Sequence, residues 1–158
     1  MKSSVVWVCK PFQHLTVQEL YAILQLRSAI FVVEQNCVYQ DLDGLDEYSH
    51  HLLAMKNDKL AAHARLLPPG VSYPEQSIGR IVVKQEERAN GLGKDLLLQS
   101  IANSYRLFGN KPIKIGAQVY LKKFYESFGF EQCSEVYDED GIEHIKMLKP
   151  LTNLSDGQ

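Results

Sequence analysis

The feature that most constrains the fold of this chain is a strand, a glycine-containing turn and a helix in direct succession. Ile78 to Lys84 is apolar and β-branched, which predicts a strand. An amphipathic pattern predicts a helix from about Gly91 to Leu107. The turn between them is the run Arg88-Ala89-Asn90-Gly91-Leu92-Gly93. Such a unit in the middle of a chain of 158 residues favours an α/β domain.

Segments with two different periodicities alternate along the rest of the chain. Thr16 and Glu19 form a capping-box pattern, which predicts the start of a helix whose apolar spacing extends to Phe31. The polar, acidic segment Asn36 to Ser49 is predicted to be a loop. The order β-α-β-β-β-α-β-α-β-β predicts an α/β fold (mixed α+β), with helices on both faces of one mixed sheet. The remaining strands are predicted at Val5–Cys9, His51–Lys56, Leu60–Leu67, Pro112–Ala117, Phe130–Tyr137 and Ile142–Leu148, and a last helix at Val119–Phe128.

Length and composition fit one domain, predicted over residues 1–150, with a flexible tail at residues 151–158. A net charge of −2 gives no general attraction to nucleic acid or anionic lipid. No stretch approaches the roughly 20 apolar residues of a membrane span, and no signal peptide is visible. We therefore expect a cytoplasmic protein without nucleic-acid or membrane partners. Cys9, Cys37 and Cys133 are predicted to be reduced thiols, because their odd number and wide spacing fit neither disulfides nor a metal site.

The run from Arg88 to Gly93 can bind an anion. Glycines allow positive φ and close approach of a ligand to the backbone, and the N–H groups at a helix start attract negative charge. Arg88 and Lys94 add positive charge on either side, so the geometry suits a pyrophosphate. On its own this signal is weak, because glycine-rich turns between strands and helices are common. The dinucleotide fingerprint and the P-loop pattern are both absent.

Together with its neighbours, the run resembles motif A of the GCN5-related N-acetyltransferases, the GNAT superfamily. Ile81-Val82-Val83 precedes Arg88-x-x-Gly91-x-Gly93, and Leu96-Leu97 follows it. Later in the chain, Phe124 to Phe130 resembles the second signature of the superfamily, in which a helix with a tyrosine precedes a Gly-Phe strand start.

A closer resemblance is to the ElaA-like family of this superfamily. It rests on six segments: Leu26-Arg27, Phe31 to Gln35, Tyr39 to Asp46, Ala64 to Gly70, Ile78 to Val83 and Asp140 to Ile145. Two positions depart from the superfamily pattern. Ala89 stands where glycine is frequent, so the backbone there must use ordinary dihedral angles, and Gln118 stands where asparagine is usual.

The resemblance implies a twisted sheet of six to seven strands with a splayed central pair, and acetyl-CoA as co-substrate without a metal. In such enzymes an amine attacks the thioester directly. By resemblance, the Val83 N–H faces the thioester carbonyl and Tyr125 is the general acid. For the base we favour Glu34 over Asp43, Asp46, Glu47, His50, His51, His63, His144 or a water chain. The residues assigned to the cofactor are Val82, Val83, Arg88, Ala89, Asn90, Gly91, Leu92, Gly93, Lys94 and Gln118.

The acceptor side is less defined by the sequence. The predicted acceptor is a primary amine on a small molecule, protein or peptide, and a homodimer is left open. Two alternatives remain for the activity: the charged set also resembles acyl-homoserine-lactone synthases, and the chain could be a CoA-binding regulator without turnover. The residues assigned to this side either form a structural network or contact the acceptor; they are Arg27, Asp43, Asp46, Arg65 and Arg80.

Overall fold

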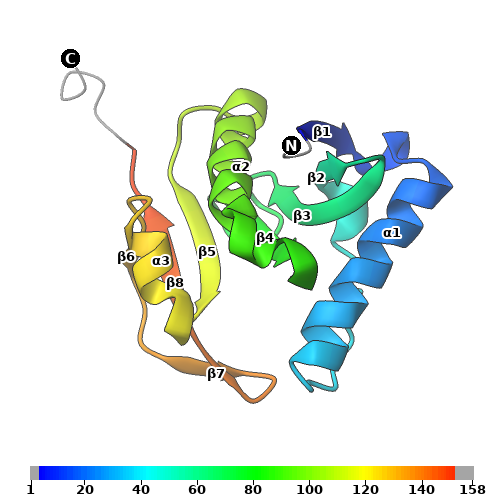
Figure 1. The fold of residues 1–158 in the computed structure, drawn as a ribbon. Coiled ribbons are helices and arrows are strands. Elements are labelled where there is room, and N and C mark those ends of the chain that lie inside the picture. The colour runs from blue at the N-terminus through cyan, green and yellow to red at the C-terminus, as the bar shows by residue number, and fades with distance from the viewer. Residues whose placement is uncertain (1–3, 152–158) are drawn as a thin grey trace.

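One eight-stranded, mainly antiparallel sheet forms the centre of the computed structural model, which describes residues 4–151 (Figure 1). The strand order is β1-β2-β3-β4-β5-β8-β6, and β7 also pairs with β8. The predicted α/β class is thereby confirmed, whereas most of the predicted flexible tail, residues 152–158, lies outside the described residues. The strands are β1 (Val5–Pro11), β2 (His50–Lys56), β3 (Lys59–Leu67), β4 (Gln76–Val83), β5 (Ile113–Gln118), β6 (Glu131–Gln132), β7 (Tyr137–Glu139) and β8 (Ile142–Lys149).

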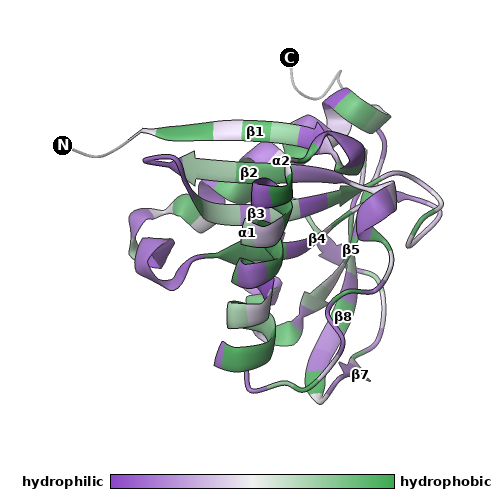
Figure 2. Ribbon diagram, turned by 90° about the vertical axis from the view of Figure 1, so that its right-hand side faces the viewer, coloured by the Kyte–Doolittle hydropathy of each residue, from purple (hydrophilic) through white to green (hydrophobic). Residues whose placement is uncertain are grey.

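Helices cover both faces of the sheet, as predicted. α1 (Val17–Arg27) continues into a π-helical segment, Ser28–Glu34, and lies across β2, β3 and β4 on one face (Figure 2). α2 (Leu92–Phe108) and α3 (Lys122–Glu126) lie on the other face (Figure 1). Four short 3₁₀ segments connect these elements, at Phe12–His14, Asp46–Tyr48, Gln85–Asn90 and Val119–Leu121.

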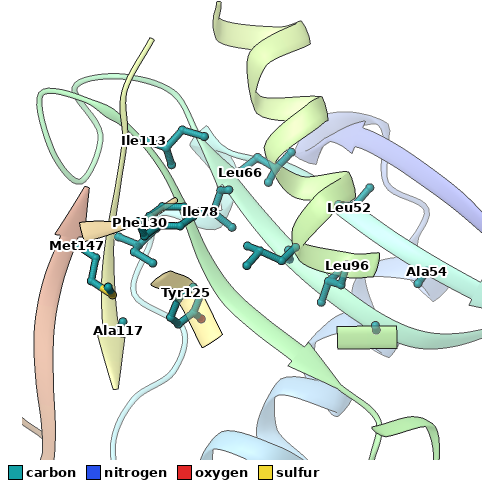
Figure 3. Close-up of a cluster of buried hydrophobic side chains, with 14 of the residues drawn as sticks. Leu52, Ala54, Leu66, Ile78, Leu96, Ile113, Ala117, Tyr125, Phe130 and Met147 are labelled. Carbon is teal, nitrogen blue, oxygen red and sulfur yellow. The ribbon is translucent and has the colours of Figure 1, made fainter. Parts of the chain in front are cut away.

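The strand alternation separates the main apolar core on one face of the sheet from a face on which polar side chains are buried as well. Leu52 on β2 points toward α2 and joins the main hydrophobic core (Figure 3). Ala64, its register partner on β3, belongs to the same core. Their neighbours His51, His63 and Arg65 point the other way, toward α1, and are also buried. Buried polar groups need partners, so the α1 face must contain a hydrogen-bond network.

The start of α1 follows the predicted capping box. The Thr16 hydroxyl accepts from the Glu19 N–H at 3.0 Å, and the Glu19 carboxylate accepts from the Thr16 N–H at 2.8 Å. These two bonds satisfy donors that a helix start leaves open. The π-helical segment after α1 was not predicted. Such segments are rare and often occur at functional sites.

β4 and β5 separate soon after they meet, which confirms the splayed central pair. They pair in parallel only at Gln76 with Ile113 and at Ser77 with Lys114. A bulge in the β3–β4 ladder bends β4 at the same level, and Arg80 there has a φ of +48°. A bulge increases local bending, so it helps to turn the end of β4 away from β5.

The C-terminal hairpin differs from the prediction. The strand expected over Phe130–Tyr137 is broken into β6 and β7, which explains why the sheet has eight strands rather than six to seven. The Ser134 hydroxyl accepts from the Lys146 N–H at 2.8 Å, in place of a regular ladder bond. The turn is only two residues long, Asp140 and Gly141, with φ of +53° and +83°.

Candidate active site

A cavity of about 710 Å³ lies where β4 and β5 separate. One end is at Arg88 and Gly93, beside the start of α2, and the other end is at Tyr73, Gly116 and Glu139. A space of this size fits a small-molecule site. Ten of the predicted site residues line it: Glu34, Asp43, Arg65, Arg80, Val82, Val83, Arg88, Gly93, Gln118 and Tyr125.

The backbone of Val83 points into the gap between the two strands. The Lys84 N–H donates to the Ala61 carbonyl at 2.9 Å, so Lys84 is directed toward β3. Because neighbouring residues alternate in an antiparallel ladder, the N–H and C=O of Val83 face away from β3. The Val83 carbonyl accepts a bond from Arg88 Nε at 3.3 Å on that side. A free N–H therefore faces the cavity at this position.

The turn before α2 has the features of an anion site. Gly91 has a φ of +75° and precedes the helix without any side-chain cap, so the first N–H groups have no such partner. A Cβ on Gly93 would lie 3.8 Å from the Val83 side chain, so a larger residue would fill space beside the cavity. Ala89 lies in the 3₁₀ segment with ordinary dihedral angles, as expected.

Several residues assigned to the cofactor lie outside the cavity. Lys94 is exposed and the Leu92 side chain is buried in the main core, so only the Leu92 backbone remains available to a ligand. Ala89, Asn90 and Gly91 are also exposed beyond its edge. The turn can therefore hold a phosphate chiefly through backbone N–H groups and Arg88.

Tyr125 lies at the edge of the core and lines the cavity (Figure 3). Its ring packs edge-on against Phe124 and Phe130, at centroid distances of 5.4 and 5.9 Å. Burial, with a smaller contribution from Tyr120, raises the pKa of Tyr125 to about 12. The phenol is therefore protonated at neutral pH and can donate a proton.

Three arginines and three aspartates form a network over the α1 face. Arg27 is fully buried and donates to Asp41 at 2.8 Å and to Asp46 at 2.7 Å. Such charge-assisted bonds are strong and offset the cost of burying the charges. Arg65 donates to both oxygens of Asp43, at 2.8 and 2.9 Å, and to Asp46 at 3.2 Å; Arg80 donates to Asp41 at 2.7 Å.

The three arginines hold the acidic loop in place through hydrogen bonds to the aspartate side chains of that loop. Burial opposes ionisation of Asp43, but the bonds from Arg65 and the Leu45 N–H hold its pKa at about 2. Arg27 and Asp46 do not line the cavity, whereas Asp43, Arg65 and Arg80 do. The geometry thus contains a structural network, one of the two alternatives that the sequence left open, and only part of this network reaches the cavity.

Two buried histidines lie beneath this network. His51 Nδ1 and His63 Nε2 are 3.0 Å apart, and His51 Nε2 is 3.0 Å from the Asp46 carbonyl. His50 instead packs on Phe108 of α2, on the opposite face, which agrees with the prediction that neighbouring histidines do not form a metal pair. Within residues 4–151, no cluster of histidine, cysteine, aspartate or glutamate is arranged to hold a metal ion.

Asp41, one of the acids of the predicted loop, binds both Arg27 and Arg80. Sequence reasoning missed two other residues at this site. Gly116 and Tyr73 form one end of the cavity but belong to no recognised motif. A glycine inside a strand is a signal for close backbone approach, so Gly116 could have been noted on that ground.

A second hollow, of about 1000 Å³, lies between α1 and the β2–β3 hairpin. Ile30 and Glu34 border both spaces. Of the predicted site residues, only Glu34 lies in its wall. Among the described residues, no helix is both long and apolar enough to cross a membrane.

The splayed strands, the turn before α2 and the tyrosine in the gap define an acyltransferase of the GNAT type. A family model described as an acetyltransferase (GNAT) domain matches residues 18–151, so the chain belongs to this superfamily. It is 43% identical to protein ElaA of Escherichia coli K12 over 149 residues, 93% of this chain and 97% of that protein. It is 42% identical to a UPF0039 protein of Schizosaccharomyces pombe, over 94% of this chain and 99% of the relative. The chain is thus ElaA-like.

Solved structures agree with this assignment. An acyl-CoA N-acyltransferase from Pseudomonas aeruginosa superposes with a TM-score of 0.89 at 42% identity, over 92% of this chain and 99% of that one. Escherichia coli ElaA superposes with a TM-score of 0.86, also at 42% identity and with the same coverage. The acyl-homoserine-lactone synthase LasI, at 10% identity and a TM-score of 0.73, shares the fold alone.

Proposed function

We propose that the protein transfers an acetyl group from acetyl-CoA to a primary amine by direct attack. The observation that carries this proposal is the cavity between β4 and β5, which brings the Val83 N–H, the turn before α2 and Tyr125 to one space. Only the coarser statement, a GNAT-type acyltransferase, follows from the family. The acyl group and the acceptor are the proposed part.

Each residue has a defined task in this reaction. The diphosphate of CoA binds the N–H groups before α2 and Arg88. The amine nitrogen attacks the thioester carbon, and the developing oxyanion accepts a bond from the Val83 N–H. The carbon–sulfur bond then breaks, and Tyr125 gives its proton to the leaving thiolate. The proton lost by the amine passes to Glu34 or to solvent, from which Tyr125 recovers its own.

Release of free thiol from acetyl-CoA tests this proposal. The purified protein is mixed with acetyl-CoA and, separately, polyamines, amino acids, drug-like amines and peptides. Thiol release that depends on an amine, with the N-acetyl product found by mass spectrometry, supports the proposal. CoA binding without any release would favour a non-catalytic CoA-binding regulator, and failure to bind CoA would overturn the account of the cavity.

A further inference from the structure

Two of the acids that line the cavity, Asp43 and Glu34, are bound by arginines, and this limits how an acceptor can be held. Asp43 is bound by Arg65 and Arg80, and Glu34 by Arg88. The acidic loop therefore offers little free negative charge to attract a cationic acceptor.

Two tyrosine hydroxyls meet over Gly116 at the far end of the cavity. A Cβ on Gly116 would lie 3.1 Å from the Tyr137 hydroxyl and 3.2 Å from the Tyr73 hydroxyl. Neither hydroxyl makes a hydrogen bond to any residue from 4 to 151. Both phenols are protonated near neutral pH, because burial raises the pKa of each. Two free donors thus point at one small space.

Two ammonium groups lie against the same rings. Lys146 Nζ is 5.1 Å from the centroid of Tyr73 and 4.7 Å from that of Tyr137, and Lys114 Nζ is 5.3 Å from Tyr73. Within the described part of the chain, neither ammonium has a carboxylate partner. The nearby Glu139 carboxylate lies 3.2 Å from His144 Nε2, a contact that is an ion pair when the histidine is protonated. The cluster of Tyr73, Lys114, Gly116, Tyr137 and Lys146 thus carries two positive charges and no carboxylate of its own, although Glu139 and Asp140 line the same cavity.

This cluster lies on the face where an acceptor would enter. Gly116 and Lys146 are register partners on β5 and β8, and their neighbours Ile115 and Met147 point into the core beside α2 and α3. The cluster thus faces the α1 side, whereas the proposed phosphate turn begins α2 on the other side. The two substrates of a direct transfer can meet in the gap from opposite faces.

From these contacts we infer that the acceptor carries a carboxylate as well as its amine, and that Tyr73, Tyr137 and Lys146 bind that carboxylate. The inference rests on the proposed transfer to an amine. The β4–β5 register, Gln76 with Ile113 and Ser77 with Lys114, puts Gly79 and Gly116 at the same level of the two separating strands. Gly79 is four residues from Val83, at most about 13 Å along a strand. A hydrogen bond and the attack distance take about 3 Å each, which leaves about 7 Å between nitrogen and carboxylate. An amino acid fits this distance when its amine and its carboxylate lie at opposite ends of a flexible carbon chain.

The test compares 6-aminohexanoate with its carboxamide as acceptors of the acetyl group. We expect kcat/KM to be at least 10-fold higher for the carboxylate, as a charge-assisted bond requires. Lys146→Met and Tyr137→Phe should remove this preference by raising KM for the carboxylate, with the amide unaffected. Lys111→Met, which changes an exposed lysine before β5, should retain it.

Two outcomes would overturn the inference without affecting the proposed function. One is equal use of acid and amide by the wild-type protein, and the other is an unchanged preference in both variants. If no acceptor supports thiol release, calorimetric titration of 6-aminohexanoate into the CoA-saturated protein decides the matter. Binding that Lys146→Met weakens at least 10-fold supports the carboxylate site, and absence of binding rejects it. Circular dichroism melts confirm that each variant is folded.

Discussion

Glu34 Oε2 and Arg88 Nη1 form an ion pair of 2.8 Å at the end of the cavity beside the start of α2. Glu34 and Arg88, both predicted to be functional residues, therefore bind each other in this structure. A bound diphosphate would draw Arg88 away and leave the Glu34 carboxylate free beside the reacting amine. Cofactor binding and exposure of the proposed base would then be coupled, because one arginine serves both carboxylate and phosphate.

Replacement of Glu34 by Gln should separate these two effects. Without its partner, Arg88 is available to the diphosphate, and we expect the Kd for CoA to fall by about 2- to 5-fold, as for a partly exposed ion pair. Turnover should fall by about 100-fold if Glu34 accepts the proton. Titration calorimetry measures the first effect and thiol release the second.

The matched control for this prediction is Glu86→Gln. Glu86 lies in the same 3₁₀ segment as Arg88 but is exposed and forms only a loose pair with Lys84, at 3.7 Å. The Glu86→Gln variant should have the same Kd for CoA and the same kcat as the wild type. Weaker CoA binding by Glu34→Gln would contradict the proposed competition for Arg88.

Replacement of Arg27 by Met should destabilise the protein without direct effect on chemistry. Arg27 is fully buried between Asp41 and Asp46, so its loss leaves buried carboxylates with fewer partners. We expect the free energy of unfolding to fall by about 3 to 5 kcal/mol, measured by urea denaturation. Arg106→Met, at an exposed position on α2, should cost less than about 0.5 kcal/mol. A loss of equal size in both variants would show that the network contributes little.

The buried histidine pair should make the protein less stable in mild acid. Burial, and then the neighbouring His51, keep the pKa of His63 well below its usual value. The unfolded chain therefore binds more protons below about pH 6.5, and stability falls as the pH drops from 7 to 5. One such histidine contributes a slope of about 1.4 kcal/mol per pH unit.

His63→Gln tests this pH dependence, since the amide can still donate to His51 Nδ1 but does not titrate. Urea denaturation at pH 5, 6 and 7 should show a shallower slope for this variant than for the wild type. His14→Gln, at an exposed position, should keep the wild-type slope. If His63→Gln loses stability in acid as steeply as the wild type, the histidine pair is not the cause.

Gly93→Val should block the cofactor end of the cavity. The added side chain would enter the space beside Val83, because a Cβ at position 93 would itself lie 3.8 Å from the Val83 side chain. We expect at least a 10-fold higher Kd for CoA by titration calorimetry, with a melting temperature close to that of the wild type. Ala102→Val, on the exposed side of the same helix, should leave CoA binding unchanged. Wild-type affinity in Gly93→Val would place the ligand elsewhere.

The sequence predicted the fold well where a structural feature depends only on residues that are close together in the chain. The capping box at Thr16 depends on neighbouring residues and occurs as expected. The second helix was expected to end near Leu107, and α2 ends at Phe108 with Gly109 as its C-cap. The break between β6 and β7 depends on a hydroxyl of Ser134 that replaces a ladder bond, and no periodicity reveals it. The left-handed Arg80 depends on the β3–β4 ladder and on Asp41, far away in sequence.

The candidate site likewise has one part that local motifs predicted and another part that they did not. Motif residues such as Val83, Gly93 and Tyr125 could be assigned because each lies in a short run of the chain, either around the turn before α2 or in the second signature from Phe124 to Phe130. The far end of the cavity could not, because Tyr73 and Tyr137 meet over Gly116 only after three separate segments come together. Long-range packing, which a single sequence does not encode locally, decides that part of the site.

Tyr125, in the gap between β4 and β5, is the residue proposed to protonate the leaving thiolate during transfer from acetyl-CoA. The most direct test is to measure kcat and the Kd for CoA in the Tyr125→Phe variant. The control is Tyr21→Phe, which changes an exposed tyrosine on α1. We predict that kcat falls by about 100-fold or more in Tyr125→Phe while the Kd changes less than 3-fold, and that Tyr21→Phe matches the wild type. An unchanged kcat in Tyr125→Phe would contradict the account.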